Sequence, residues 1–407
     1  MIVRNVALLG HKDHGKSTLI GNLLMQTGAA TKVRIKEAEE YSKRLHKDFE
    51  PAFILDSFAE ERLNEMTIDT TRAEIKHKGI AFALIDVPGH EELITNMISG
   101  ASYGELAVLL VSAKPGEGIR DQTKRHLFIA HMLGMDRLVV AVNKMDTVDY
   151  GEEAFRSVEL GLRSFIAKIG FAKRNVSFVP ISAYMGENLV KPSKRMRWYR
   201  GKPLLEVLRA SVKLRAAAAA GSALRMLVQG TIPSNEGNLV AGKVVSGSIS
   251  VGDSVAILPA GLSARVRRII VKDRGAKAGK AGENIAVLLD KPINSGLRGS
   301  VLAGADGGLN VTDKVRMRIF VTHTFGRRMH VKFNGVEIPC RSVKVLRNID
   351  ATTGEHYGPT AAKPLDAVEA EVILARGIPV ESYASTRELG RFVLYTGREF
   401  AGIGVAE

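Results

Sequence analysis

Residues 2–17 read IVRNVALLGHKDHGKS, an apolar run that leads directly into a glycine-rich loop. The loop matches the pattern G-x-x-x-x-G-K-[ST], and a helical pattern over residues 16–26 follows it. Because this phosphate-binding loop joins a strand to a helix, the stretch predicts the first strand–loop–helix unit of an α/β domain. The loop by itself indicates a nucleoside triphosphate and leaves the base open.

Three further motifs follow later apolar runs, at positions where strands are expected to end. They are Asp86-Val87-Pro88-Gly89-His90, Asn143-Lys144-Met145-Asp146 and Ser182-Ala183. Open α/β sheets bind ligands at the carboxyl ends of their strands, so the motifs are expected to meet at one edge. The Asp146 carboxylate can accept hydrogen bonds from the ring N–H and exocyclic amine of guanine. Adenine does not offer that arrangement, so the set predicts GTP and GDP as ligands.

The expected nucleotide-binding residues come from all four motifs. They are Gly10, His11, Lys12, Asp13, His14, Gly15, Lys16, Ser17, Thr18, Asp86, Gly89, Asn143, Lys144, Asp146, Ser182 and Ala183. Lys16 is expected to reach the β- and γ-phosphate oxygens, and the Ser17 hydroxyl to ligate Mg²⁺. A carboxylate at the end of a buried strand needs a cation, so Asp86 is expected to hold Mg²⁺ through a water. Gly89 is expected to present its N–H to the γ-phosphate.

At the base end, Asn143 and Asp146 are expected on the guanine edge, with the Lys144 stem over the ring face. Ser182-Ala183 is expected to supply a backbone N–H to the guanine oxygen. Residues 60–69, EERLNEMTID, precede the second apolar strand and contain Thr67. We expect Thr67 to close over Mg²⁺ as a switch threonine; the alternative is an ordinary cap or strand residue.

The chain divides into three predicted domains. Apolar strands alternate with helix-length segments up to residue 214, which predicts a mostly parallel sheet with helices on both faces in a domain of residues 1–214. An alanine run at residues 215–222 reads as a connector. Short β-rich runs with glycine follow it and predict two all-β barrels, at residues 222–305 and 312–407.

Composition indicates a soluble, cytoplasmic globular protein. No apolar run approaches the roughly 18 residues of a membrane span, and the single cysteine, Cys340, excludes an internal disulfide. The net charge of +15 favours a polyanionic partner such as RNA, or reflects a general compositional bias. A basic cluster around Trp198 and Tyr199 is expected either to contact RNA or to form a solvated face. Its members are Lys191, Lys194, Arg195, Arg197, Arg200 and Lys202.

The motifs together resemble those of translational GTPases of the elongation factor 1-alpha and elongation factor Tu class. Shared features are the phosphate loop, Met66-Thr67-Ile68-Asp69, Asp-x-Pro-Gly-His, Asn-Lys-Met-Asp and Leu389-Gly390-Arg391-Phe392. The resemblance covers essentially the whole chain and implies a G domain followed by two β-barrels. It implies GTP hydrolysis in which His90 orients the attacking water, with Lys16 and Thr67 as the other catalytic residues. It also implies the ribosome and a tRNA or tRNA-like protein factor as partners, a nucleotide exchange factor, no membrane, and a monomer when free.

A second resemblance leaves the function open at this point. Residues 142–153 and 125–130 are similar to the GTPase subunit of ATP sulfurylase, which couples GTP hydrolysis to sulfate activation. A third alternative is an RNA or ribosome adaptor with negligible turnover. Two departures from the elongation factor pattern bear on turnover. Asn64-Glu65-Met66 replaces the usual Arg-Gly-Ile, and Lys12 stands where a small apolar residue is usual, so it either stabilises transition-state charge or points to solvent.

Overall fold

The computed structural model describes residues 3–44, 46, 48–55, 72–86, 104–135, 137–213, 222–293, 296–305 and 308–407. The chain forms two compact units, residues 1–215 with 351–354, and residues 216–350 with 355–407. No helix in these described ranges is long and apolar enough to cross a bilayer.

The first unit is an α/β domain. Its strands are β1 (Val3–Leu9), β2 (Arg72–His77), β3 (Ile80–Asp86), β4 (Gly104–Ser112), β5 (Leu138–Asn143) and β6 (Val176–Pro180). Its helices are α1 (Lys16–Gln26), α2 (Lys32–Arg44), α5 (Asp121–Met132), α6 (Glu152–Lys168) and α7 (Leu204–Lys213), with 3₁₀ turns η1 (Lys12–His14), η2 (Met145–Val148) and η3 (Lys173–Asn175).

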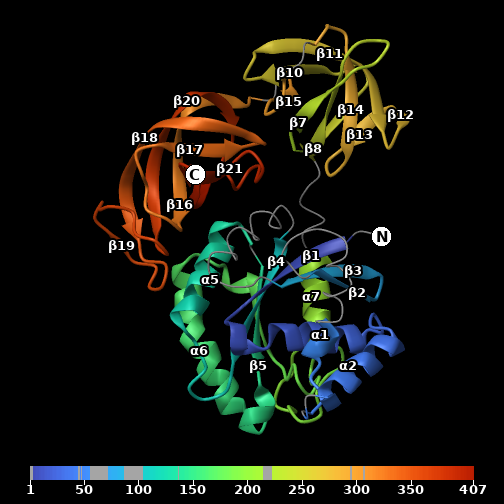
Figure 1. Cartoon of the computed structure of the whole chain (residues 1–407), viewed down its shortest axis with the longest axis vertical. Coiled ribbons are helices and arrows are strands. Elements are labelled where there is room, and N and C mark those ends of the chain that lie inside the picture. The colour runs from blue at the N-terminus through green and yellow to red at the C-terminus, as the bar shows by residue number, and fades with distance from the viewer. Residues whose placement is uncertain are drawn as a thin grey trace. The chain divides into compact units, whose positions relative to one another are not determined.

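The six strands form one sheet in the order β2-β3-β1-β4-β5-β6. All neighbours pair in parallel except β2 and β3, which form an antiparallel hairpin. In Figure 1, α5 and α6 lie on one side of this sheet and α1, α2 and α7 on the other. Residues of β5 are buried throughout because helices cover both faces, which explains the unbroken apolar runs of the sequence.

The second unit is all β. Its first sheet contains β7 (Arg225–Ile232), β8 (Leu239–Ser246), β10 (Ser254–Leu258), β11 (Leu262–Val271), β12 (Arg274–Ala276), β14 (Asn284–Leu289) and β15 (Val301–Gly304), beside a small pair of β9 (Ser248–Ser250) and β13 (Ala278–Lys280). Its second sheet contains β16 (Asn310–Val321), β17 (Met329–Phe333), β18 (Val336–Ile349), β19 (His356–Tyr357), β20 (Ala367–Val380), β21 (Arg391–Thr396) and β22 (Glu399–Ala406).

Each of these sheets closes on itself. The pairing of β10 with β11 closes the first sheet, and the pairing of β17 with β18 closes the second. Inward-facing side chains fill each barrel, for example Val228, Val240 and Val287 in the first and Met317, Val372 and Phe392 in the second. A mostly parallel α/β sheet followed by two β-barrels confirms the predicted fold class.

Candidate nucleotide-binding site

Two glycines shape the loop between β1 and α1. Gly10 has a φ of +140°, and a Cβ there would lie 2.6 Å from the Leu110 carbonyl oxygen. Gly15 precedes α1 in the left-handed conformation at φ +86°, where a Cβ would lie 2.6 Å from Asn143 Nδ2. Both positions therefore require glycine. The turn at Gly15 starts α1 directly at Lys16, so the helix N-terminus faces the loop and favours an anion there.

The Lys16 ammonium is held at the centre of this loop. Its Nζ donates to the carbonyl oxygens of Gly10 at 2.9 Å and His11 at 3.1 Å, and the residue is only 7% exposed. A buried ammonium is costly unless polar groups surround it. The carbonyls fix the amine in position while the helix N-terminus beside it attracts phosphate.

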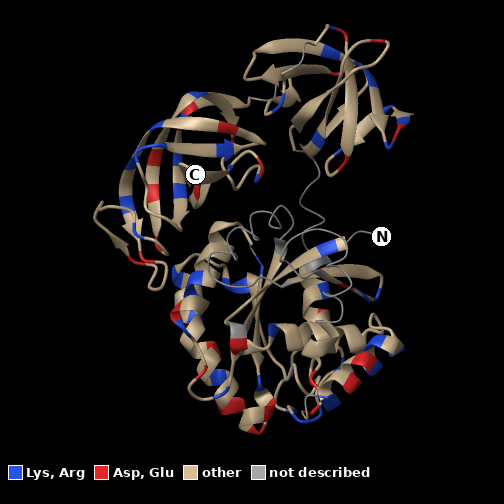
Figure 2. Cartoon of the chain, in the orientation of Figure 1, with Lys and Arg blue, Asp and Glu red and all other residues tan. Residues whose placement is uncertain are grey.

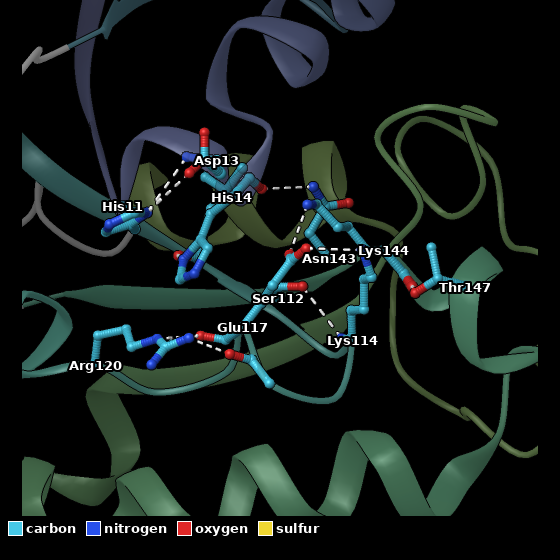
Figure 3. Close-up of polar contacts among 12 residues, drawn as sticks. His11, Asp13, His14, Ser112, Lys114, Glu117, Arg120, Asn143, Lys144 and Thr147 are labelled. Carbon is cyan, nitrogen blue, oxygen red and sulfur yellow. Dashed lines mark hydrogen bonds and ion pairs between the residues drawn. The ribbon is translucent and has the colours of Figure 1, made fainter.

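His14 anchors the loop to the sheet. Its ring is buried, and Nδ1 donates to the Leu110 carbonyl on β4 at 3.0 Å. Burial lowers the pKa of His14 below its usual value, and the nearby cations Lys144 and Lys16 act in the same direction. The imidazole is therefore neutral at pH 7. His11 and Asp13, by contrast, lie at the exposed side of the loop, where the Asp13 N–H donates to His11 Nδ1 (Figure 3).

Asn143, at the end of β5, ties two loops together. Its Nδ2 donates to the His14 carbonyl at 2.8 Å, and its Oδ1 accepts from the Ala183 N–H at 2.8 Å. The side chain is 2% exposed. Asn143 and Ala183 both line the cavity at the strand ends, and their contact with guanine stays a prediction. Asn143 positions the phosphate loop and the Ser182-Ala183 loop.

Asp146 is the carboxylate of the predicted base site. The Ser182 hydroxyl donates to Asp146 Oδ1 and accepts from the Met185 N–H at 3.0 Å. Serine at 182 therefore orients the carboxylate, a role that the sequence did not indicate. Asp146 itself is half-buried and lines a cavity at the ends of the strands.

Lys144 has a partner that the sequence analysis missed. Its Nζ lies 2.6 Å from Glu117 Oε2, and Lys114 Nζ lies 3.1 Å from the other oxygen of the same carboxylate. Figure 3 shows this group beside Ser112, at the end of β4. The hydrogen bond from Lys144 lowers the pKa of Glu117 to about 2, so the carboxylate stays charged. Glu117 follows a strand that ends at the same sheet edge, and that position was the available signal.

These elements enclose a cavity of about 560 Å³, within the range of roughly 300–1,000 Å³ for small-molecule sites. Its lining consists of Asp13, Gly15, Lys16, Ser17, Thr18, Glu50, Ala52, Lys114, Asn143, Lys144, Asp146, Thr147, Ala183 and Tyr184. The structure thus brings three of the four predicted motifs to one cavity. The expected residues Thr67, Gly89 and His90, and the side chains of Lys12 and Asp86, lie outside the described part of the chain.

The described residues of the cavity have the chemistry needed for the phosphates and for the base of a guanine nucleotide. One end of the cavity offers the helix N-terminus with the buried Lys16 ammonium, which suits phosphates, and the Ser17 hydroxyl, a hard oxygen ligand that suits Mg²⁺. The lining also includes the Asp146 carboxylate, together with Lys144 and Thr147. A carboxylate there accepts hydrogen bonds and donates none, which favours a base edge made of N–H groups.

Comparison with known proteins places the chain in a family. A family model for the elongation factor Tu GTP binding domain matches residues 1–225, and one described as GTP-eEF1A C-terminal domain-like matches residues 315–407. Elongation factor 1-alpha of Aeropyrum pernix is 33% identical, over 98% of this chain and 95% of its own length. The same factor of Ignicoccus hospitalis is 32% identical over the same shares.

Solved structures also align along most of the chain. Sup35 complexed with GDP is 23% identical, over 99% of this chain and 93% of its own, with a TM-score of 0.42. Translation elongation factor SelB from Methanococcus maripaludis, in its apo form, is 22% identical over 100% and 80%, with a TM-score of 0.45. The family model covers more than half of the chain, and the curated relatives span nearly all of it. The chain belongs to the elongation factor 1-alpha family of translational GTPases, which bind GTP and GDP with Mg²⁺.

Proposed function

We propose that this GTPase is a cytoplasmic, monomeric switch that carries a tRNA or a tRNA-like protein factor to the ribosome and is reset by an exchange factor. The observation that supports it best is the cavity at the strand ends. It joins the phosphate-binding Lys16 to the guanine-selective Asp146 in a chain that matches elongation factor 1-alpha relatives from end to end.

The residues at the phosphate end hold and orient the nucleotide. Lys16 contributes positive charge to the β- and γ-phosphate oxygens, and the Ser17 hydroxyl contributes a ligand to Mg²⁺. The bound Mg²⁺ supplies charge neutralisation for phosphoryl transfer. Asn143 keeps the phosphate loop and the Ser182-Ala183 loop at a fixed separation, since its two hydrogen bonds span them.

Hydrolysis and switching are assigned to residues outside the described ranges. We assign the orientation of the attacking water to His90, the contact with Mg²⁺ to Thr67 and Asp86, and the sensing of the γ-phosphate to Gly89. These roles rest on the motifs of the sequence and on membership of the family. Loss of the γ-phosphate would release the Thr67 and Gly89 loops together.

Two alternatives differ in what the GTPase drives. A sulfate-activating subunit needs a separate catalytic partner and no ribosome, whereas an adaptor needs RNA and no turnover. Binding of tRNA that depends on GTP in place of GDP supports the proposed switch. Equal binding of tRNA in both nucleotide states supports the adaptor. No binding of tRNA in either state, together with GTP hydrolysis that ribosomes do not stimulate, supports the sulfate-activating subunit.

The base assignment is tested by the substitution Asp146→Asn. The amide replaces a charged acceptor with a donor, so it loses the guanine N–H groups and gains the carbonyl that xanthine carries at position 2. We expect the affinity for GDP to fall by about 100-fold or more and the affinity for xanthosine diphosphate to rise. Asp149→Asn is the matched control, because Asp149 is exposed three residues away and does not line the cavity. Unchanged GDP affinity in Asp146→Asn would contradict the assignment.

A further inference from the structure

The α/β domain has a second cavity, of about 590 Å³, away from the nucleotide site. It lies where β6, the outer strand of the sheet, meets α6, α7 and the segment of residues 198–202. The helices α6 and α7 lie on opposite sides of the sheet (Figure 1). We call it the Trp198 cleft.

The lining of the Trp198 cleft is strongly basic. Its cationic residues are Arg137, Arg156, Arg163, Arg174, Arg200 and Lys202. Among the described lining residues, Glu159 is the one acidic side chain, and it is buried between Arg156, at 2.7 Å, and Arg163. The side chains of Arg137, Arg174, Arg200 and Lys202 form no ion pair with any described part of the chain. The cleft therefore presents uncompensated positive charge.

The floor of the cleft is aromatic and held in place. Trp198 Nε1 donates to the Tyr150 carbonyl at 2.8 Å, and the Tyr199 hydroxyl donates to the Phe178 carbonyl at 3.2 Å. Both rings are half-buried: they pack against Phe155, with ring centroids 5.3 and 6.2 Å away, and burial raises the pKa of Tyr199 to about 12. Gly201 permits this packing, because a Cβ there would lie 2.3 Å from the Tyr199 ring. The part of the Trp198 ring that stays exposed lines the cleft.

We propose that the Trp198 cleft binds single-stranded or looped RNA. The arginines and Lys202 would hold backbone phosphates, and the exposed part of the Trp198 ring would contact an unstacked base. Arginine forks match phosphate oxygens, and aromatic rings accept bases of any sequence. The inference goes beyond the proposed switch, since a cleft of this kind needs neither GTP turnover nor the ribosome.

The exposure of the cations favours a chain-like polyanion over a mononucleotide. Arg156 and Arg163 on α6 are 51% and 44% exposed, and Arg174, Arg200 and Lys202 on two other segments are exposed as well. A mononucleotide site encloses its phosphate, as the loop around Lys16 does. Cations that are spread along an open rim instead suit phosphates spaced along a strand.

The test uses Trp198 as a probe, because it is the one tryptophan of the chain. The full-length protein with GDP is titrated with a 12-nucleotide oligouridylate of RNA while tryptophan fluorescence is recorded. We expect saturable quenching. We expect Arg174→Gln with Lys202→Gln to weaken binding about tenfold or more. The two substitutions should also make the plot of log binding constant against log salt concentration less steep by roughly 1.4, because each removes one contact with a phosphate of the single strand.

The control pair is Lys36→Gln with Lys43→Gln on α2, which removes the same charge from exposed positions. Figure 2 shows that α2, like α6, carries both signs of charge. Equal weakening by both pairs would overturn the proposal, as would RNA binding without a change in Trp198 fluorescence. Displacement of the RNA by polyglutamate at equal affinity would also overturn it and assign the cleft to acidic polypeptides. Intrinsic GTP hydrolysis, measured in parallel, is expected to be unchanged in both pairs, so failure here is distinguishable from failure of the switch.

Discussion

Asn143 joins two loops of the nucleotide site through one buried amide. Replacing it with alanine leaves the His14 carbonyl and the Ala183 N–H buried without this partner, at a cost of about 1–3 kcal/mol each. We therefore expect Asn143→Ala to weaken GDP binding by roughly 10- to 100-fold or more, measured by titration with a fluorescent GDP analogue. Asn143→Asp retains the acceptor for Ala183 and loses only the donor. If both variants bound GDP like the wild type, the positioning role would be wrong.

The hydrogen-bond partners of Asn143 could not be predicted from the sequence. The tetrad of residues 143–146 predicts a guanine site, and the structure places Asp146 in the cavity. The tetrad does not reveal that the Asn143 amide is used within the protein, because its partners are backbone groups 129 and 40 residues away. Glu117 was missed for a similar reason. A glutamate in a loop is ordinary until the fold brings Lys144 to it.

The β2–β3 hairpin is attached to α7 through Glu206. One oxygen of this carboxylate accepts from His77 Nε2 at 2.9 Å and pairs with Lys78 Nζ at 2.5 Å, while the other pairs with Arg209 at 3.0 Å. The hydrogen bonds from Lys78 and His77 lower the pKa of Glu206 to about 2, from 4.5. The charged form is therefore preferred in the folded state.

The pH dependence follows from this lowered pKa. The unfolded chain takes up the Glu206 proton near pH 4.5 and the folded domain only near pH 2, so this stabilisation is present above about pH 4.5 and is lost between pH 4.5 and 2. We expect the urea midpoint of the wild type to exceed that of Glu206→Gln above pH 4.5, and the difference to shrink towards pH 2. Trp198 fluorescence follows the transition, and Glu39→Gln, on the exposed face of α2, is the control. A difference that does not vary with pH would refute the assignment.

A strand can be predicted from the sequence when its apolar residues are continuous or alternate clearly with polar ones. Apolar residues are continuous or alternate over residues 80–86, 239–246 and 254–258, and these segments form β3, β8 and β10. Strand β22 shows no such pattern, because glycines interrupt its apolar residues. The structure explains them: a Cβ at Gly402 would lie 2.2 Å from the Phe320 carbonyl, and one at Gly404 would meet Met317 at 3.2 Å. These glycines permit close approach of strands, which the sequence does not reveal.

The two barrels are linked by a buried ion pair between Arg225 on β7 and Glu381 after β20. Arg225 Nη2 lies 2.5 Å from Glu381 Oε1, with side-chain exposures of 5% and 19%. Burial alone would raise the pKa of Glu381, and the hydrogen bonds from Arg225 and Thr386 hold it below its usual value. The Glu381 carboxylate is therefore kept charged by Arg225, and its burial depends on that partner.

Removing one partner is expected to be costly. Arg225→Met leaves a largely buried carboxylate without its cation, so we expect a loss of about 3–5 kcal/mol. In urea unfolding followed by far-UV circular dichroism, the transition of the barrels should move to lower urea. The transition of the first unit, followed by Trp198 fluorescence, should keep its midpoint. Arg225→Met with Glu381→Leu removes both charges and should recover most of the loss. Equal stability of the single and double variants would show that the unpaired charge is not the cause.

The proposed role of this GTPase in translation requires that its hydrolysis of GTP responds to the ribosome. The most direct test is the rate of GTP hydrolysis with and without ribosomes from the same organism. We predict that ribosomes stimulate hydrolysis by roughly 10³-fold or more, which is the size of effect that GTPase-activating proteins have on other GTPase switches. Normal GTP binding with an unchanged rate in the presence of ribosomes would contradict the account and turn attention to a sulfate-activating partner.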